Sequence, residues 1–166
     1  MRILYNLLMV IIIILSPVIV FYRILKKKEN PKRFLEKFGF FKKKRVNGKL
    51  IWFHCSSVGE LLSIVPLIEK FEKDKNIKSI LISTSTLSSS KIFKKFKFKK
   101  TIHQFYPIDN PLIVNKFLCY WKPTAAFFVE SEIWPEMLRG LKRKKIKTFL
   151  LNARISKNSF HKWKYF

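Results

Sequence analysis

Two acidic segments of this chain carry the residue types best suited to chemistry. One reads His-Cys-Ser-Ser-Val-Gly-Glu and ends at Glu60; the other reads Val-Glu-Ser-Glu-Ile-Trp-Pro and holds Glu130 and Glu132. Each segment follows a short apolar run, so its carboxylates fall where a buried strand should end and a helix begin. Open α/β sheets place their ligand crevice at that edge. A carboxylate there can accept a proton from a substrate hydroxyl, which makes these three glutamates the candidate functional acids.

The segment that ends at Glu60 has two interpretations. Gly59 allows a tight turn or the close approach of a ligand, and Ser57 can cap the helix that follows. Glu60 then lies in the first helical turn, where the helix dipole favours its ionised form. The same Ser-x-x-Glu spacing fits a capping box, and spacing alone favours that structural role over a catalytic one.

The alternation of apolar runs and amphipathic stretches predicts an α/β fold with a mostly parallel, Rossmann-like sheet. Strands are expected at residues 50–54, 79–83, 101–105, 125–129 and 147–151, and helices at 60–73, 88–96, 111–120 and 134–144. The sequence has no Gly-x-Gly-x-x-Gly or Walker-type loop, so nothing in it supports nucleotide binding by this part. Cys55 and Cys119 have neither disulfide context nor zinc spacing.

The N-terminal residues 1–25 are predicted to form a membrane-anchor helix. Residues 3–22 are almost entirely apolar, and about twenty such residues suffice to cross a bilayer. The basic residues that follow place this flank in the cytoplasm. Pro17 leaves open a partly embedded helix, and a secretory signal is disfavoured because no small-residue cleavage site precedes the basic cluster. Residues 26–48 are predicted to be a basic linker with a short helix.

The charge of the chain points to a polyanionic partner. There are 35 Lys and Arg against 10 Asp and Glu, a formal net charge of +25. Such a surface attracts nucleic acid or anionic membrane lipids. The anchor favours the membrane, and nucleic-acid binding lacks any recognisable reading motif. Residues 26–28, 42–45 and 94–100 are the clusters expected to face lipid headgroups.

Four segments resemble, in the same order and at similar separations, segments of the bacterial 3-deoxy-D-manno-octulosonic acid (Kdo) transferases of lipopolysaccharide synthesis. They are the Ser-Val-Gly-Glu string within residues 51–60, the Pro-x-Asp-x-Pro turn within 106–111, Glu-Ser-Glu-Ile-Trp-Pro at 130–135 and Asn-Ala-Arg-Ile-Ser at 152–156. The resemblance implies the N-terminal half of a GT-B glycosyltransferase, with residues 49–166 as its acceptor-binding domain. One departure is a serine in the stretch 83–90, where the family usually has glycine.

The reaction that the resemblance implies is transfer of Kdo from CMP-Kdo to a lipid A precursor, lipid IVA, at the cytoplasmic face of the inner membrane. The implied mechanism is inverting, by a single displacement at the anomeric carbon, with no cofactor or metal. Glu60 is then the general base. Ser56, Ser57 and Gly59 are expected to line the acceptor cleft through their backbone amides.

Three further residues receive roles from the resemblance. Of Glu130 and Glu132, one is expected to orient the acceptor or a basic neighbour and the other to cap the helix that opens near residue 135; Glu130 is favoured for function because it stands closer to the strand end. Arg154 is expected to hold an acceptor phosphate or the donor carboxylate. The alternative for Arg154, an ion pair with one of these glutamates, is equally weighted.

Length sets a limit on this interpretation. A chain of 166 residues suffices for one ordinary domain but not for a second of similar size. We therefore expect the C-terminal donor domain, which would bring CMP-Kdo, to be absent. The alternative function is a catalytically inactive, membrane-associated module that binds anionic lipid.

Overall fold

The computed structural model describes residues 2–130, 132–153 and 161. The chain begins with helix α1 (Arg2–Leu25) and a short 3-10 helix, η1 (Phe34–Phe38). Strands and helices then alternate in the order β1 (Leu50–Cys55), α2 (Val58–Lys73), β2 (Ser79–Thr84), α3 (Leu87–Phe93), β3 (Thr101–Phe105), α4 (Pro111–Trp121), β4 (Ala125–Val129), α5 (Pro135–Arg143) and β5 (Lys147–Leu151).

The predicted α/β fold is confirmed. All five strands are paired in parallel, in the order β3-β2-β1-β4-β5. Each predicted strand is found within one residue of its expected bounds. The helices differ more at their ends: α2 starts two residues earlier, and α3 is shorter than predicted.

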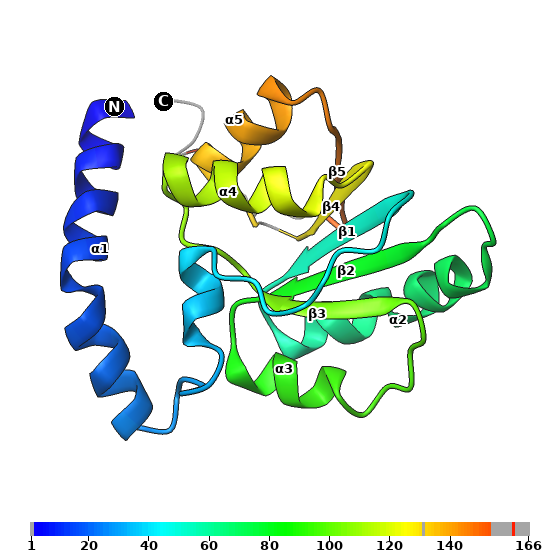
Figure 1. Ribbon diagram of the computed structural model, residues 1–166, viewed down its shortest axis with the longest axis horizontal. Helices are drawn as coiled ribbons and strands as arrows, with labels where there is room; N and C mark the ends of the chain where they lie inside the picture. Colours follow the sequence, from blue (N-terminus) through cyan, green and yellow to red (C-terminus); the bar gives the residue numbers. More distant parts are fainter. Residues whose placement is uncertain (1, 131, 154–160, 162–166) are drawn as a thin grey trace.

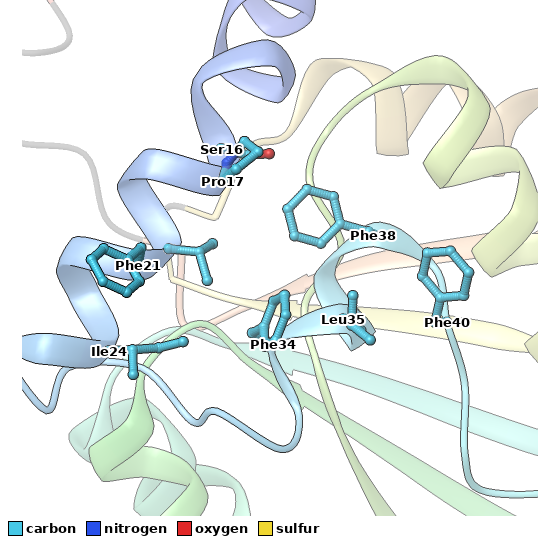
Figure 2. Close-up of a pocket in the computed structure, with 9 residues that line it drawn as sticks. Ser16, Pro17, Phe21, Ile24, Phe34, Leu35, Phe38 and Phe40 are labelled. Carbon is cyan, nitrogen blue, oxygen red and sulfur yellow. The ribbon is translucent and has the colours of Figure 1, made fainter.

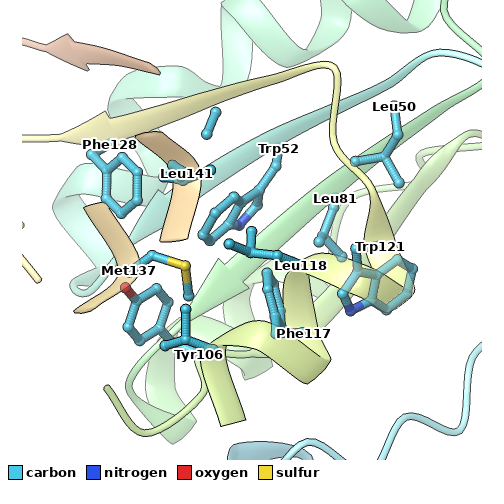
Figure 3. Packing of buried hydrophobic residues seen from close by; sticks show 12 residues of the cluster. Leu50, Trp52, Leu81, Tyr106, Phe117, Leu118, Trp121, Phe128, Met137 and Leu141 are labelled. Atoms are coloured by element: carbon cyan, nitrogen blue, oxygen red, sulfur yellow. The ribbon is translucent and has the colours of Figure 1, made fainter. Parts of the chain in front are cut away.

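Helices cover both faces of the sheet (Figure 1). Helices α4 and α5 pack on one face, over an aromatic cluster that Figure 3 shows from close by. Within it the Trp52 ring lies 4.9 Å from Phe117 and 5.3 Å from Phe128, centroid to centroid. Helices α2 and α3 pack on the other face over a mainly aliphatic cluster. Burial on both faces explains why the central strands β1, β2 and β4 are largely apolar rather than alternating.

Helix α1 runs beside this domain as a separate arm (Figure 1). Its segment Leu7–Leu25 has a mean hydropathy of 2.6 and is almost entirely uncovered by the rest of the protein. In length and composition it suits a membrane span, as it would a signal sequence. Pro17 lies inside the helix without ending it.

Two contacts join α1 to the domain. The Tyr5 hydroxyl donates to Asp109 Oδ2 at 2.6 Å. Further along, α1 and η1 enclose an apolar cavity of about 470 Å³. Figure 2 shows Phe21 and Ile24 of α1 facing Phe34 and Phe38 across it. The domain therefore holds α1 near both ends.

Candidate functional site at the carboxyl edge of the sheet

The two acidic segments lie at the point where the strand order reverses. Strand β1 pairs with β2 on one side and with β4 on the other. From β1 the chain continues through β2 to β3 at one edge of the sheet, and from β4 it continues to β5 at the opposite edge. Crevices for ligands in open α/β sheets form at this switch point, beyond the carboxyl ends of the strands. The loop after β1 leads to Glu60, and the loop after β4 holds Glu130 and Glu132.

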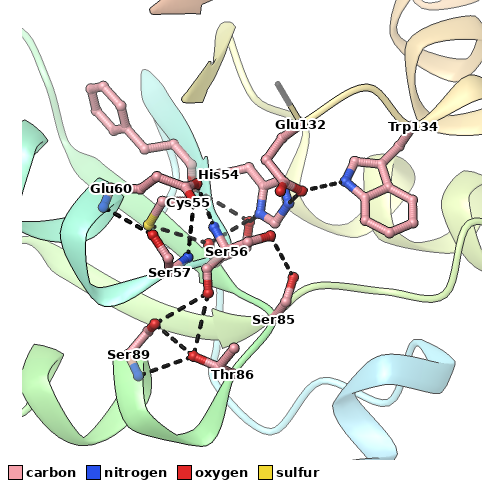
Figure 4. Close-up of polar contacts among 12 residues, drawn as sticks. His54, Cys55, Ser56, Ser57, Glu60, Ser85, Thr86, Ser89, Glu132 and Trp134 are labelled. Atoms are coloured by element: carbon pink, nitrogen blue, oxygen red, sulfur yellow. Dashed lines mark hydrogen bonds and ion pairs between the residues drawn. The ribbon is translucent and has the colours of Figure 1, made fainter. Parts of the chain in front are cut away.

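Glu60 forms the predicted capping box at the start of α2 (Figure 4). The Ser57 hydroxyl accepts a hydrogen bond from Glu60 N at 3.1 Å. In return the carboxylate accepts from Ser57 N at 3.2 Å and from Ser56 N at 2.8 Å. Glu60 is only 9% exposed. The carboxylate is thus held in one place, with acceptor capacity left for a further donor because two oxygens offer about four lone-pair sites.

Glu132 is held by two donors. Its Oε2 lies 3.2 Å from His54 Nε2 and 2.8 Å from Trp134 Nε1, and the nearby Ser56 hydroxyl also lowers its pKa. Burial raises the pKa of this carboxyl, but the interactions with His54, Ser56 and Trp134 outweigh it and bring the pKa down to about 2. Glu132 is therefore a permanent negative charge at neutral pH.

Ser56 lies between the two carboxylates, because its main-chain N–H donates to Glu60 and its hydroxyl helps to lower the pKa of Glu132. The neighbouring thiol of Cys55 senses both charges: burial, and then Glu60 and Glu132, raise its pKa well above the ordinary value. Cys55 stays a protonated, buried thiol and is unsuited to act as a nucleophile. Glu60 and Glu132 thus meet around one short loop.

Glu130 follows β4 directly and has a left-handed backbone, with φ of 59°. Its neighbour at the end of β5, Asn152, has φ of 53°, and Glu130 N donates to Leu151 O at 2.8 Å. Left-handed conformations cost a residue with a side chain about 1 kcal/mol and cluster at functional sites. The half-buried Glu130 side chain has no hydrogen bond or ion pair to any other residue in the described part of the chain, which leaves it available to a ligand.

The Ser/Thr-rich loop after β2 supports the same site. The hydroxyls of Thr86 and Ser89 donate to Ser56 O at 3.3 and 3.2 Å, and the Ser85 hydroxyl lies 3.1 Å from that of Ser56 (Figure 4). No residue between 83 and 90 has a positive φ. The backbone here does not require the glycine usual in the resembled family.

The other predicted site residues have mixed outcomes. The amides of Ser56 and Ser57, expected to face the acceptor, donate to Glu60 instead. Gly59 is exposed, and a Cβ there would meet only Ser57 Oγ, at 4.0 Å, so the surface beside Glu60 is open. Arg154 lies outside the described residues.

The prediction that Glu130 or Glu132 caps the helix after residue 134 is wrong. Helix α5 has no side-chain cap from its own N-cap residue; Asp109 supplies one from a distant loop. Its carboxylate accepts from Glu136 N at 2.9 Å and Met137 N at 2.8 Å. Local spacing could not reveal this cap, although Asp109 belongs to the Pro-x-Asp-x-Pro turn noted in the sequence.

The arrangement can take a proton from a hydroxyl and hold negative charge beside it. In the described ranges no cluster of three or more His, Cys, Asp or Glu side chains could hold a metal ion. The parallel sheet with acidic loops at its switch point is consistent with the N-terminal, Rossmann-like half of a GT-B fold.

The family description "3-Deoxy-D-manno-octulosonic-acid transferase (kdotransferase)" matches residues 32–166. The chain belongs to this family. It is 37% identical over 142 residues to the probable mitochondrial 3-deoxy-D-manno-octulosonic acid transferase of Arabidopsis thaliana, covering 86% of this chain and 32% of that one. It is 38% identical over 147 residues to the 3-deoxy-D-manno-octulosonic acid transferase of Rickettsia bellii, which covers 89% of this chain and 35% of that protein. To the 3-deoxy-D-manno-octulosonic acid transferase of Haemophilus influenzae it is 27% identical over 157 residues, which covers 92% of this chain and 37% of that protein. The chain spans about a third of the length of these relatives.

Proposed function

We propose that this chain is the acceptor-binding half of a Kdo transferase, which presents a lipid A precursor such as lipid IVA to CMP-Kdo. The observation that carries this proposal is that the segment from His54 to Ser57 holds both carboxylates at the switch point of the sheet, Glu60 through the amides of Ser56 and Ser57 and Glu132 through the His54 ring. Family membership supplies the sugar and the reaction class. The apolar α1 supports a location at the cytoplasmic face of the inner membrane.

In the proposed mechanism Glu60 accepts the proton of the attacking acceptor hydroxyl. The hydroxyl oxygen then forms the new bond to the anomeric carbon of Kdo as CMP leaves, in one inverting displacement. The capping box aids this step because it fixes the carboxylate before the acceptor arrives. The open surface at Gly59 is the approach that the acceptor would use.

Glu132 is assigned a different role. With a pKa of about 2 it is too weak a base to take a proton from an alcohol efficiently. It instead orients Ser56 and holds charge near the acceptor. Glu130, with its unengaged carboxylate, is the candidate contact to an acceptor hydroxyl or to a cationic partner such as Arg154.

The experiment joins this chain to the C-terminal part of the Rickettsia bellii relative and measures Kdo transfer to lipid IVA. Glu60→Gln is the informative variant, because Gln still fits a capping box but cannot act as the base. Transfer should fall by about 100-fold or more. Glu72→Gln is the matched control, since Glu72 lies at the other end of α2 and also accepts two backbone amides, from Lys99 and Lys100.

Two results would reject the proposal. One is full transfer by the Glu60→Gln chimaera with unchanged thermal stability. The other is a complete lack of transfer by the folded chimaera with the unaltered sequence, which would match a catalytically inactive lipid-binding module.

A further inference from the structure

A basic cavity of about 270 Å³ lies between the end of α1 and the start of α3. Four cationic and two hydroxyl side chains line it: Arg23, Lys27, Lys28, Lys91, Thr86 and Ser88. No Asp or Glu within the described ranges lines this cavity. The cations come from two parts of the chain about sixty residues apart, so the fold gathers them, and the cluster is not merely a run of lysines.

The backbone at the end of α1 is built to present these cations. Lys28 N donates to Arg23 O and Lys27 N to Ile24 O, which is the Schellman pattern of a helix C-terminus. The left-handed residue of that pattern is usually glycine. Here it is Lys27, with φ of 54°. A lysine thus occupies a position at which the backbone conformation alone would favour glycine.

Arg23 is also held in place. Its Nε lies 3.3 Å from Glu29 Oε2, and its Nη2 donates to Lys28 O at 3.3 Å. The buried Glu29 carboxylate is shared with Lys37, whose Nζ lies 2.6 Å away. One carboxylate therefore serves two cations, and the cavity keeps an excess of positive charge.

Clustered Arg and Lys side chains with the Ser88 hydroxyl beside them suit a phosphate group, which accepts several charge-assisted hydrogen bonds. A phosphate monoester carries about −1.5 to −2 charges at neutral pH, whereas a diester carries a single charge. The four cations of the cavity therefore suit a monoester better than a diester. The last turns of α1 line this cavity and also the apolar cavity of Figure 2. A lipid offers both a phosphate and a hydrocarbon chain to such a pair of neighbouring cavities.

We propose that the basic cavity between α1 and α3 binds a phosphate monoester carried by a lipid. Thr86 connects this cavity to the candidate site, because its hydroxyl both lines the cavity and donates to Ser56 O. A lipid phosphate held there lies one residue contact away from the loop that positions Glu60. That the bound lipid is the sugar acceptor rests on the proposed function; the binding of the phosphate does not.

The test uses the full chain in neutral detergent micelles and titrates it with dioctanoyl phosphatidic acid, followed by calorimetry. Lys27→Gly removes one cavity cation while it suits the left-handed backbone. Lys145→Gly is the matched control, because Lys145 is exposed, has φ of 55° and lies after α5, away from the cavity. Lys91→Gln tests the α3 side of the cavity.

We expect saturable binding that weakens about fivefold or more in Lys27→Gly and in Lys91→Gln, and changes less than about twofold in Lys145→Gly. Equal losses in both glycine variants would show diffuse charge attraction and overturn the proposal. So would equal binding of dioctanoyl phosphatidylglycerol, a diester. Equal binding of inorganic phosphate would overturn the lipid as the source. The titration contains no sugar donor and does not measure transfer. Phosphate binding can therefore be established even if the chimaera of the proposed function has no transferase activity.

Discussion

Nε2 of His54 lies 3.2 Å from Oε2 of Glu132, so a residue near the end of strand β1 fixes a carboxylate from the loop after β4. The imidazole is itself immobile: it is fully buried, stacks on Tyr106 with centroids 3.8 Å apart, and has Nδ1 3.1 Å from Ser83 Oγ. An ionised carboxylate only accepts hydrogen bonds, so Nε2 is the donor. The position of Glu132 is therefore set by the sheet core.

Glu132→Gln should weaken the decrease of the unfolding free energy as the pH falls below about 4.5. The carboxyl pKa is about 2 in the folded chain against an ordinary 4.5. The charge therefore contributes stability that is fully present above about pH 4.5 and is lost as the pH falls toward 2. In that window the unfolding free energy of the unaltered chain should fall faster than that of the variant, by up to about 1.4 kcal/mol per pH unit. Urea unfolding at several pH values measures this, with the exposed Glu69→Gln as control; parallel curves would refute it.

His103 should stay neutral well below pH 6. Arg33 Nη2 lies 2.9 Å from its Nδ1, and since arginine only donates, Nδ1 accepts and Nε2 donates to Thr84 Oγ1 at 2.9 Å. Burial, and then the charges of Arg33, Lys43 and Lys94, lower its pKa to about 3.

Because the unfolded chain takes up this proton near pH 6.5, the His103 contribution to stability is complete above that pH and is lost as the pH falls toward 3. An NMR titration of the ring should show no change between pH 7 and 4. A midpoint near 6.5 in the folded protein would contradict the buried network.

Tyr5 and Asp109 should be energetically coupled. The Asp109 carboxylate accepts from the Tyr5 hydroxyl and from two amides of α5. A double-mutant cycle of Tyr5→Phe and Asp109→Asn should give a coupling of about 1 kcal/mol, measured by thermal unfolding in micelles. Tyr22→Phe, at an exposed position of the same helix, should cost far less. A coupling of zero would contradict the hydrogen bond between Tyr5 and Asp109.

Gly140→Ala should destabilise the protein although alanine favours helices. A Cβ at this position would lie 2.8 Å from Leu118 Cδ1 and 2.9 Å from Val114 Cγ1, at the contact of α4 with α5. Such overpacking costs about 1–3 kcal/mol. Gly59→Ala, with open space around it, is the control and should change the unfolding free energy by less than about 0.5 kcal/mol. Equal denaturation midpoints for the two variants would refute the close packing.

The fold was predictable because its central strands, β1, β2 and β4, are buried on both faces. The run Leu50–Phe53 is apolar throughout and lies between Gly48 and the serines at 56 and 57, so both the existence and the approximate bounds of β1 follow from composition. The end of α3 was less predictable. Its last residues differ little in helix propensity from the lysine-rich loop that follows, and only packing of Phe93 into the core marks where the helix stops.

The site was predictable in part. That the loops after β1 and β4 lie at the same edge follows from a parallel sheet, and the capping box of Ser57 and Glu60 follows from spacing; that β1 and β4 are neighbours is known only from the structure. The cap of α5 by Asp109 and the contact of Arg33 with His103 join residues 27 and 70 positions apart. Neither leaves a local pattern, because each depends on the finished packing of distant elements.

Strand β1 is the first strand to be synthesised, yet it occupies the middle of the sheet. Its edge Ile51–His54 gains its partner β4 only after the ribosome has added residues up to 128, roughly 4–15 s later at ordinary elongation rates. During that interval the nascent chain displays an unpaired, hydrophobic strand edge. Successful biogenesis of this protein therefore depends on keeping that edge from pairing with other chains until β4 has been made.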